Sequence, residues 1–131
     1  MKELNILLVE DAADFRDLIK VYLRRLKARV DEALNGEEAV KLFTEKTYDI
    51  VLMDMQMPVM DGFAATRRIR ELEGGERRVP IIAMTAYDEI GTSRKCKSAG
   101  SDYYLVKPIQ REYLLRLIQD LTDSNHSAVD E

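Results

Sequence analysis

The sequence predicts an α/β protein in which helices cover both faces of a five-stranded parallel sheet. Five short hydrophobic segments alternate along the chain with five segments of helical periodicity. The strongest hydrophobic segments are uninterrupted, which is typical of strands buried on both faces, as in parallel sheets. The 131 residues make up one domain of ordinary size. Right-handed crossovers and one reversal of direction then give a doubly wound sheet, for which 2-1-3-4-5 is a common strand order.

The expected strands are identified by their hydrophobic residues. Four are continuous apolar runs whose length is typical of strands rather than helices. A weaker segment after the first run is predicted to form a further strand. In chain order, the expected strands cover residues 6–9, 29–34, 50–53, 81–84 and 103–106.

Helices are expected between the strands and after the last one. The first is the clearest, because its apolar residues from Phe15 to Leu26 recur at the spacing of one helix face. The fourth, between Asp88 and Ala99, is the weakest. It has few apolar residues and contains Gly91, which costs about 1 kcal/mol relative to alanine inside a helix. The other three are indicated by apolar residues within 39–43, 65–72 and 114–121.

The C-terminal residues differ in composition from the rest of the chain. Residues 122–131 are mostly small, polar and acidic. We expect them to form a solvated tail or the start of a linker. The predicted domain therefore covers residues 1–121, and the initial methionine suggests a domain that stands alone or begins a longer protein.

Composition excludes several classes of partner. The net charge is −4 and the pI about 5.2, which disfavours nucleic acid, because binding needs a basic surface to replace phosphate counterions. One cysteine suits a reducing compartment, and no apolar run has the ~20 residues of a membrane span. We expect a cytoplasmic protein with no membrane partner and no direct contact with nucleic acid. One stretch of the chain is rich in arginine but also contains acidic residues, so we predict that it forms a solvated face. The arginines of this basic stretch are Arg67, Arg68, Arg70, Arg77 and Arg78.

Polar residues follow the hydrophobic runs where ligands bind in parallel sheets, at the carboxyl ends of the strands. Glu10 and Asp11 follow the predicted strand at 6–9, and Asp54 follows the one at 50–53. Thr85 follows the predicted strand at 81–84, and Lys107 follows the one at 103–106. The fold should therefore bring three carboxylates, a hydroxyl and an ammonium to one edge of the sheet.

The electrostatics of this cluster point to a metal and a phosphoryl group. Three carboxylates ~5 Å apart repel by about 3 kcal/mol per pair at an effective dielectric of 20, or about 10 kcal/mol together. Lys107 offsets part of this repulsion, and Mg²⁺, a hard cation that prefers oxygen ligands, offsets most of it. Asp54 is then the nucleophile that forms an aspartyl phosphate, with charge stabilised by Lys107 and the metal. Thr85 would donate a hydrogen bond to a phosphoryl oxygen.

With these residues in place, the sequence resembles the receiver domain of two-component response regulators over residues 4–121, and most closely the receivers of hybrid histidine kinases. The segments 53–62 and 82–86 carry the closest likeness. The resemblance implies a flavodoxin-like fold and a role for each matching position. By this resemblance, Glu10 and Asp11 form the acid pair that binds the metal, and Asp54 is the phosphoacceptor. Thr85 is the hydroxyl residue and Tyr104 the aromatic residue of the conformational switch, and Lys107 matches the lysine of the family's active site.

The resemblance also implies the cofactor and the partners. The cofactor is Mg²⁺, coordinated in addition by the backbone carbonyl of Gln56, and the Lys107–Pro108 bond is cis. The phosphoryl donor is a histidine kinase or a histidine phosphotransfer domain. An attached or separate output domain and a phosphorylation-dependent dimer are further implied partners. Such a chain is a signalling phosphoacceptor rather than an enzyme with a separate substrate.

Four positions distinguish this sequence from other members of the family that it resembles. Ala12 stands where the receivers of hybrid kinases often carry Asn, and this difference is expected to alter docking of the phosphoryl donor. Lys27 stands where these receivers frequently carry Gly. Gln56 and Tyr87 occupy the two positions that tune hydrolysis in the family. A neutral tyrosine does not activate water, and its ring can shield the phosphate. We therefore expect the phosphoryl group to be lost slowly, over many minutes or longer.

Three other functions fit parts of the sequence. A phosphatase of the haloacid dehalogenase type also forms an aspartyl phosphate, but it needs a second Asp where this chain has Gln56, and a cap domain. A flavodoxin-like electron carrier shares the sheet order, but Glu10 and Asp11 would repel the flavin phosphate. A pseudo-receiver that only binds partners remains open, although the complete set of site residues disfavours it.

Overall fold

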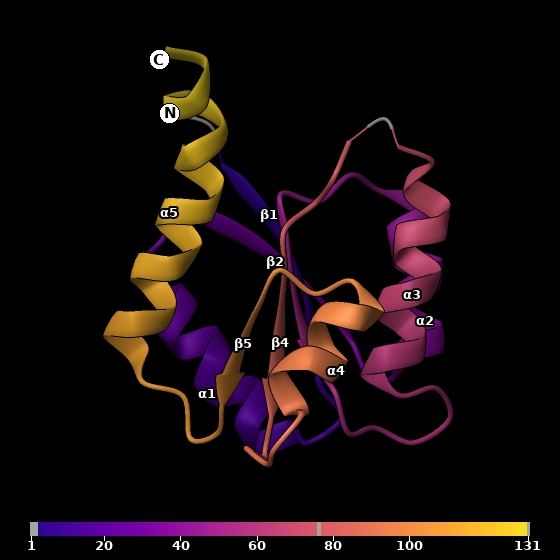
Figure 1. The fold of residues 1–131 in the computed structure, drawn as a ribbon. Helices are drawn as coiled ribbons and strands as arrows, with labels where there is room; N and C mark the ends of the chain where they lie inside the picture. The colour runs from indigo at the N-terminus through magenta and orange to yellow at the C-terminus, as the bar shows by residue number, and fades with distance from the viewer. Residues whose placement is uncertain (1–2, 76, 131) are drawn as a thin grey trace.

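The computed structural model describes residues 3–75 and 77–130 (Figure 1). In this part of the chain five parallel strands form one sheet in the order β2-β1-β3-β4-β5. The predicted fold class and strand order are confirmed. The strands are β1 (Leu4–Val9), β2 (Ala28–Ala33), β3 (Ile50–Asp54), β4 (Ile81–Thr85) and β5 (Tyr103–Val106). The helices are α1 (Ala13–Leu23), α2 (Gly36–Glu45), α3 (Gly62–Glu73), α4 (Thr92–Ala99) and α5 (Arg111–Asp130).

Helices pack on both faces of the sheet, and two hydrophobic clusters result. Figure 1 shows α1 and α5 on one side of the strands and α2 and α3 on the other. Ile19 of α1 and Leu114 of α5 belong to the first cluster, whereas Ile69 of α3 and Cys96 of α4 belong to the second. The central strands β3 and β4 are buried along their whole length, which explains their uninterrupted apolar sequence.

The fourth helix begins later than the sequence predicts. We expected a helix from Asp88, with Gly91 inside it, but α4 begins at Thr92. Gly91 precedes the helix with a φ of 93°, in the left-handed region that glycine adopts without steric cost. The glycine thus ends a turn in which the backbone N–H of Glu89 donates to the Thr92 hydroxyl oxygen (3.0 Å).

The last helix is longer than expected. The backbone remains helical from Arg111 to Asp130, across most of the predicted tail. Neither glycine nor proline interrupts this segment, so its polar composition does not stop the helix. The division into a domain at 1–121 and a tail at 122–131 stays a prediction. Within the described residues no helix combines the length and the hydrophobicity that crossing a membrane requires.

One residue of the basic stretch is not on a solvated face. The Arg70 side chain is only 13 % exposed and pairs with Glu73 (2.9 Å) and Asp102 (2.8 Å). Its guanidinium also donates to the carbonyl oxygens of Gly100 and Val79, both at 2.8 Å. The prediction was wrong for Arg70, because Gly100 and Asp102, in the turn between α4 and β5, lie 30 and 32 residues away and reach the guanidinium only in the folded chain. Arg68 is exposed, as expected.

Candidate functional site

The sheet brings the predicted residues together at its carboxyl edge. Asp54 is the last residue of β3, and the strand order places β3 between β1 and β4. Glu10 and Asp11 follow β1 directly, Thr85 ends β4, and Lys107 follows β5. Asp54 therefore lies in the middle of the edge, between the acid pair and the hydroxyl, as the sequence predicts.

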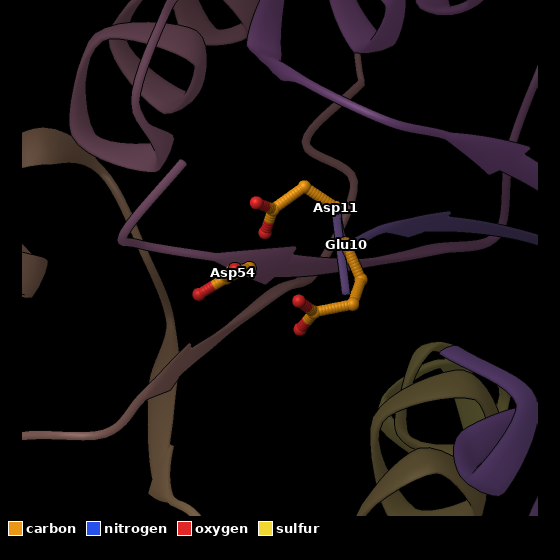
Figure 2. Close-up of side chains that lie close together, drawn as sticks. All are labelled: Glu10, Asp11 and Asp54. Carbon is orange, nitrogen blue, oxygen red and sulfur yellow. The ribbon is translucent and has the colours of Figure 1, made fainter. Parts of the chain in front are cut away.

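The three acids form a compact cluster (Figure 2). One carboxylate oxygen from each of Glu10, Asp11 and Asp54 lies within 4.8 Å of the others. Glu10 and Asp54 are each 1 % exposed, whereas Asp11 is exposed to solvent. The cluster is therefore buried on one side and open on the other, where a ligand can enter.

Burial and crowding of these acids make ionisation of Asp54 costly. Burial first, and then the negative charge of Glu10, raise the pKa of Asp54 to about 7. The backbone N–H of Gln56, which donates to Asp54 Oδ1 (3.1 Å), and the Lys107 ammonium act in the opposite direction. A ligand that brings further positive charge would favour the ionised carboxylate, which is the form needed for nucleophilic attack.

Lys107 supplies positive charge to the cluster. Its Nζ is 2.9 Å from Glu10 Oε1 and 3.4 Å from Asp54 Oδ1. The backbone N–H of Lys107 donates to the Thr85 carbonyl oxygen (2.8 Å), and the bond to Pro108 is cis, as the resemblance implies. One ammonium cannot neutralise three carboxylates.

The donor set fits Mg²⁺. Three carboxylates with an open, solvated side provide oxygen ligands and leave room for water and for phosphoryl oxygens, which Mg²⁺ prefers. Glu10 already uses Oε2 to accept from the backbone N–H of Ala12 (3.1 Å), which orients the carboxylate. The Gln56 carbonyl stays a predicted fourth ligand.

The Thr85 hydroxyl is held by hydrogen bonds from Gln56 and Tyr87. The Gln56 amide Nε2 donates to Thr85 Oγ1 (3.1 Å), and so does the backbone N–H of Tyr87 (3.1 Å). Gln56 Oε1 accepts from the backbone N–H of Ala86 (3.3 Å). Our sequence interpretation missed this role of the Gln56 side chain. Its position just beyond β3, next to β4, is the signal that would have indicated it.

Tyr87 is predicted to slow hydrolysis by covering the site. Tyr87 is 58 % exposed and lines a cavity of about 300 Å³ together with Gln56 and Thr85. The backbone N–H of Tyr87 is thus hydrogen-bonded to Thr85, while the residue as a whole is exposed. Shielding of a bound phosphate by the ring stays a prediction.

Tyr104 connects the last strand to the turn before α4. The residue is half-buried, and its hydroxyl donates to Asp88 Oδ1 (3.2 Å). The charge of Asp88 raises the pKa of Tyr104 above its usual value. The predicted switch aromatic therefore lies against the segment that follows Thr85, two elements away from the phosphoacceptor.

Comparison with known proteins places this site in a family. The model of the response regulator receiver domain matches residues 6–119. The transcriptional regulatory protein ResD of Bacillus subtilis is 41% identical over 116 residues, which are 88% of this chain and 47% of that protein. Hybrid signal transduction histidine kinase G of Dictyostelium discoideum is 42% identical over 119 residues, 89% of this chain and 4% of that protein. The chain thus spans less than half the length of these two relatives.

Solved structures agree in fold and in sequence. The receiver domain of a sensor histidine kinase from Pseudomonas aeruginosa PAO1, with a magnesium ion coordinated in its active-site cleft, is 43% identical with a TM-score of 0.84, covering 92% of this chain and 98% of that one. A receiver domain crystallised with a histidine phosphotransfer protein of Saccharomyces cerevisiae gives 32% identity and a TM-score of 0.83, covering 92% and 89%. The family match, these relatives and the acidic edge of the sheet lead to one conclusion: the chain belongs to the response regulator receiver domain family.

Proposed function

We propose that Asp54 accepts a phosphoryl group from a phosphohistidine of a histidine kinase or a phosphotransfer domain. The observation that supports this most is the placement of one buried carboxylate between two further acids and an ammonium. Magnesium held by Glu10, Asp11, Asp54 and the Gln56 carbonyl would neutralise charge on the phosphoryl oxygens. An Asp54 oxygen attacks phosphorus as the bond from phosphorus to the histidine nitrogen breaks, and that nitrogen keeps the electron pair and takes up a proton.

Lys107 and Thr85 complete the proposed chemistry. The Lys107 ammonium, 3.4 Å from Asp54 Oδ1, is close enough to pair with a phosphoryl oxygen on the acceptor. The Thr85 hydroxyl would turn from Gln56 and Tyr87 to donate to another phosphoryl oxygen. The signal then arises because the hydroxyl exchanges one set of partners for another.

The change at Thr85 would reach the surface through Tyr104. The loop after β4 contains both Tyr87, which holds Thr85, and Asp88, which holds Tyr104. Release of the first contact frees the loop, and Tyr104 can turn toward the space that Thr85 leaves. In response, the conformational equilibrium of the surface formed by α4, β5 and α5 shifts toward the state favoured by phosphorylation.

Phosphorylation by a small donor tests the proposal. After incubation with acetyl phosphate and Mg²⁺, we expect intact mass spectrometry to find one added phosphoryl group, which disappears without Mg²⁺ and in Asp54→Asn. Asp61→Asn is the matched control: Asp61 is exposed and caps α3 through the backbone N–H of Ala64, and asparagine caps equally well. It should be phosphorylated like the wild type. No adduct would indicate a pseudo-receiver, and continuous release of phosphate without an adduct would indicate a phosphatase.

We further propose that the chain catalyses only its own phosphorylation and slow dephosphorylation. Neither the Gln56 amide nor the Tyr87 phenol is a general base that could take a proton from water. The phosphoryl group should therefore persist for many minutes or longer after the donor is removed. Its loss can be followed by intact mass over time in Mg²⁺, and a lifetime of seconds would contradict this prediction.

The remaining parts of the proposal concern partners and location. The relatives that this chain matches over only part of their length support an output domain, attached or separate. A dimer that forms on phosphorylation and a cytoplasmic location complete the proposal. The acidic net charge supports a partner other than nucleic acid.

A further inference from the structure

An aromatic ring lies against the ammonium of the site. Phe15, in the first turn of α1, places its ring centroid 4.3 Å from Lys107 Nζ. We propose that Phe15 is a positioning residue for phosphoryl transfer, whose ring holds the Lys107 ammonium at the acceptor through a cation–π interaction. This inference rests on the proposed phosphorylation of Asp54.

The other partners of the ammonium are the residues that the metal would use. Lys107 Nζ contacts Glu10 Oε1 at 2.9 Å and Asp54 Oδ1 at 3.4 Å. When Glu10 and Asp54 coordinate a divalent cation, part of their attraction for Lys107 is lost, and the metal repels the ammonium. A neutral ring face attracts a cation without being a metal ligand, and this attraction strengthens where water is excluded. The Lys107 side chain is 21 % exposed, so the contact is largely shielded from solvent.

Both sides of this contact are fixed to the site. Phe15 is partly buried against the hydrophobic cluster beneath α1 and α5. The adjacent Arg16 donates through Nη1 to the carbonyl oxygens of Glu10 (3.1 Å) and Asp11 (3.4 Å), which ties the first turn of α1 to the acid pair. Lys107 is anchored by its backbone N–H to the Thr85 carbonyl oxygen (2.8 Å). The ring therefore keeps its place when the charges around Lys107 change.

Stepwise fluorination of the ring tests the interaction. Phenylalanine with one, two or five ring fluorines, incorporated at position 15, keeps nearly the same shape while its face becomes progressively less negative. We expect the initial rate of phosphorylation by acetyl phosphate at saturating Mg²⁺ to fall along the series, by about 5- to 30-fold at the end. Phe15→Tyr should retain the rate, whereas Phe15→Leu should lose as much as the most fluorinated ring. Circular dichroism confirms that each variant is folded.

Phe63 provides a matched control within the same chain. Its ring lies 4.5 Å from Lys95 Nζ, a similar pair that is not part of the acid cluster. The same fluorinated series at position 63 should leave the rate unchanged. Equal losses at the two positions, or no loss at position 15, would overturn the inference and reduce Phe15 to a packing residue.

A second readout separates this inference from the proposed function. In the unphosphorylated protein, the ring of Phe15 should shift the ε-methylene proton resonances of Lys107 upfield. These resonances should move toward random-coil values along the fluorinated series as the ammonium leaves the ring. If the wild type forms no phosphoryl adduct but the Lys107 chemical shifts still change along the fluorinated series, the proposed function is wrong and the contact between Phe15 and Lys107 is supported. Shifts that do not respond to fluorination contradict the inference whatever the adduct shows.

Discussion

Replacement of Arg70 by methionine is expected to lower the free energy of unfolding by about 3 to 5 kcal/mol, the usual cost of removing one partner from a buried ion pair. Glu73 is only 7 % exposed and would lose its cation. Asp102, which also accepts from the backbone N–H of Ile81 (2.8 Å), would lose its ion pair with α3 and keep its ion pair with Arg78. The carbonyl oxygens of Gly100 and Val79 would lose a charged donor as well.

Urea unfolding followed by circular dichroism measures this loss. Arg68→Met is the matched control, because Arg68 lies on the same helix and pairs with Glu71 at the surface, where the two side chains are 54 % and 67 % exposed. Its replacement should change the free energy of unfolding by less than about 0.5 kcal/mol. Equal effects of the two substitutions would show that the Arg70 network does not stabilise the fold.

Gly62→Ala is expected to lower the free energy of unfolding by about 3 kcal/mol and to slow phosphorylation of Asp54. A Cβ atom on Gly62 would lie 2.2 Å from the Asp54 carbonyl oxygen and 2.7 Å from Met55 Cα. Both are backbone atoms, so the clash is relieved only by moving the end of β3 that carries the phosphoacceptor. Overpacking of this kind costs about 1 to 3 kcal/mol, and more where nothing can yield.

Gly75→Ala separates the clash from the general cost of replacing glycine. Gly75 has a φ of 86°, but a Cβ there would meet no atom within 4 Å. Only conformational strain remains, at about 1 to 2 kcal/mol, and the phosphorylation rate should stay that of the wild type. If Gly62→Ala were as stable and as fast in phosphorylation as Gly75→Ala, the close approach of α3 to the acceptor strand would have no functional consequence.

The sheet and its acidic edge could be predicted from sequence because both depend on local patterns. Uninterrupted apolar runs identify buried strands, and the residue after each run must lie at the shared edge. Asp54, Thr85 and Lys107 therefore lie at the edge where the sequence predicts them. Helix boundaries were less certain, because Gly91 reads as a weak helix residue until its left-handed conformation is seen.

Two important interactions that the sequence did not reveal join residues distant along the chain. Arg70 and Asp102 are 32 residues apart, and no local pattern separates Arg70 from its exposed neighbour Arg68. The Gln56 amide reaches Thr85 across 29 residues, because β3 and β4 lie side by side. Such pairings depend on tertiary packing, which single-sequence patterns do not encode.

Identification of the phosphorylated side chain tests the central claim most directly. After phosphorylation by acetyl phosphate in Mg²⁺, borohydride reduces an aspartyl phosphate to homoserine, and tandem mass spectrometry locates the new residue. The structure predicts homoserine at position 54 alone, because the Asp54 carboxylate is at the centre of the edge beside Lys107. Modification at Glu10 or Asp11 with Asp54 unchanged, or a stable phosphoryl group that borohydride leaves in place, would contradict the assignment of Asp54 as the phosphoacceptor.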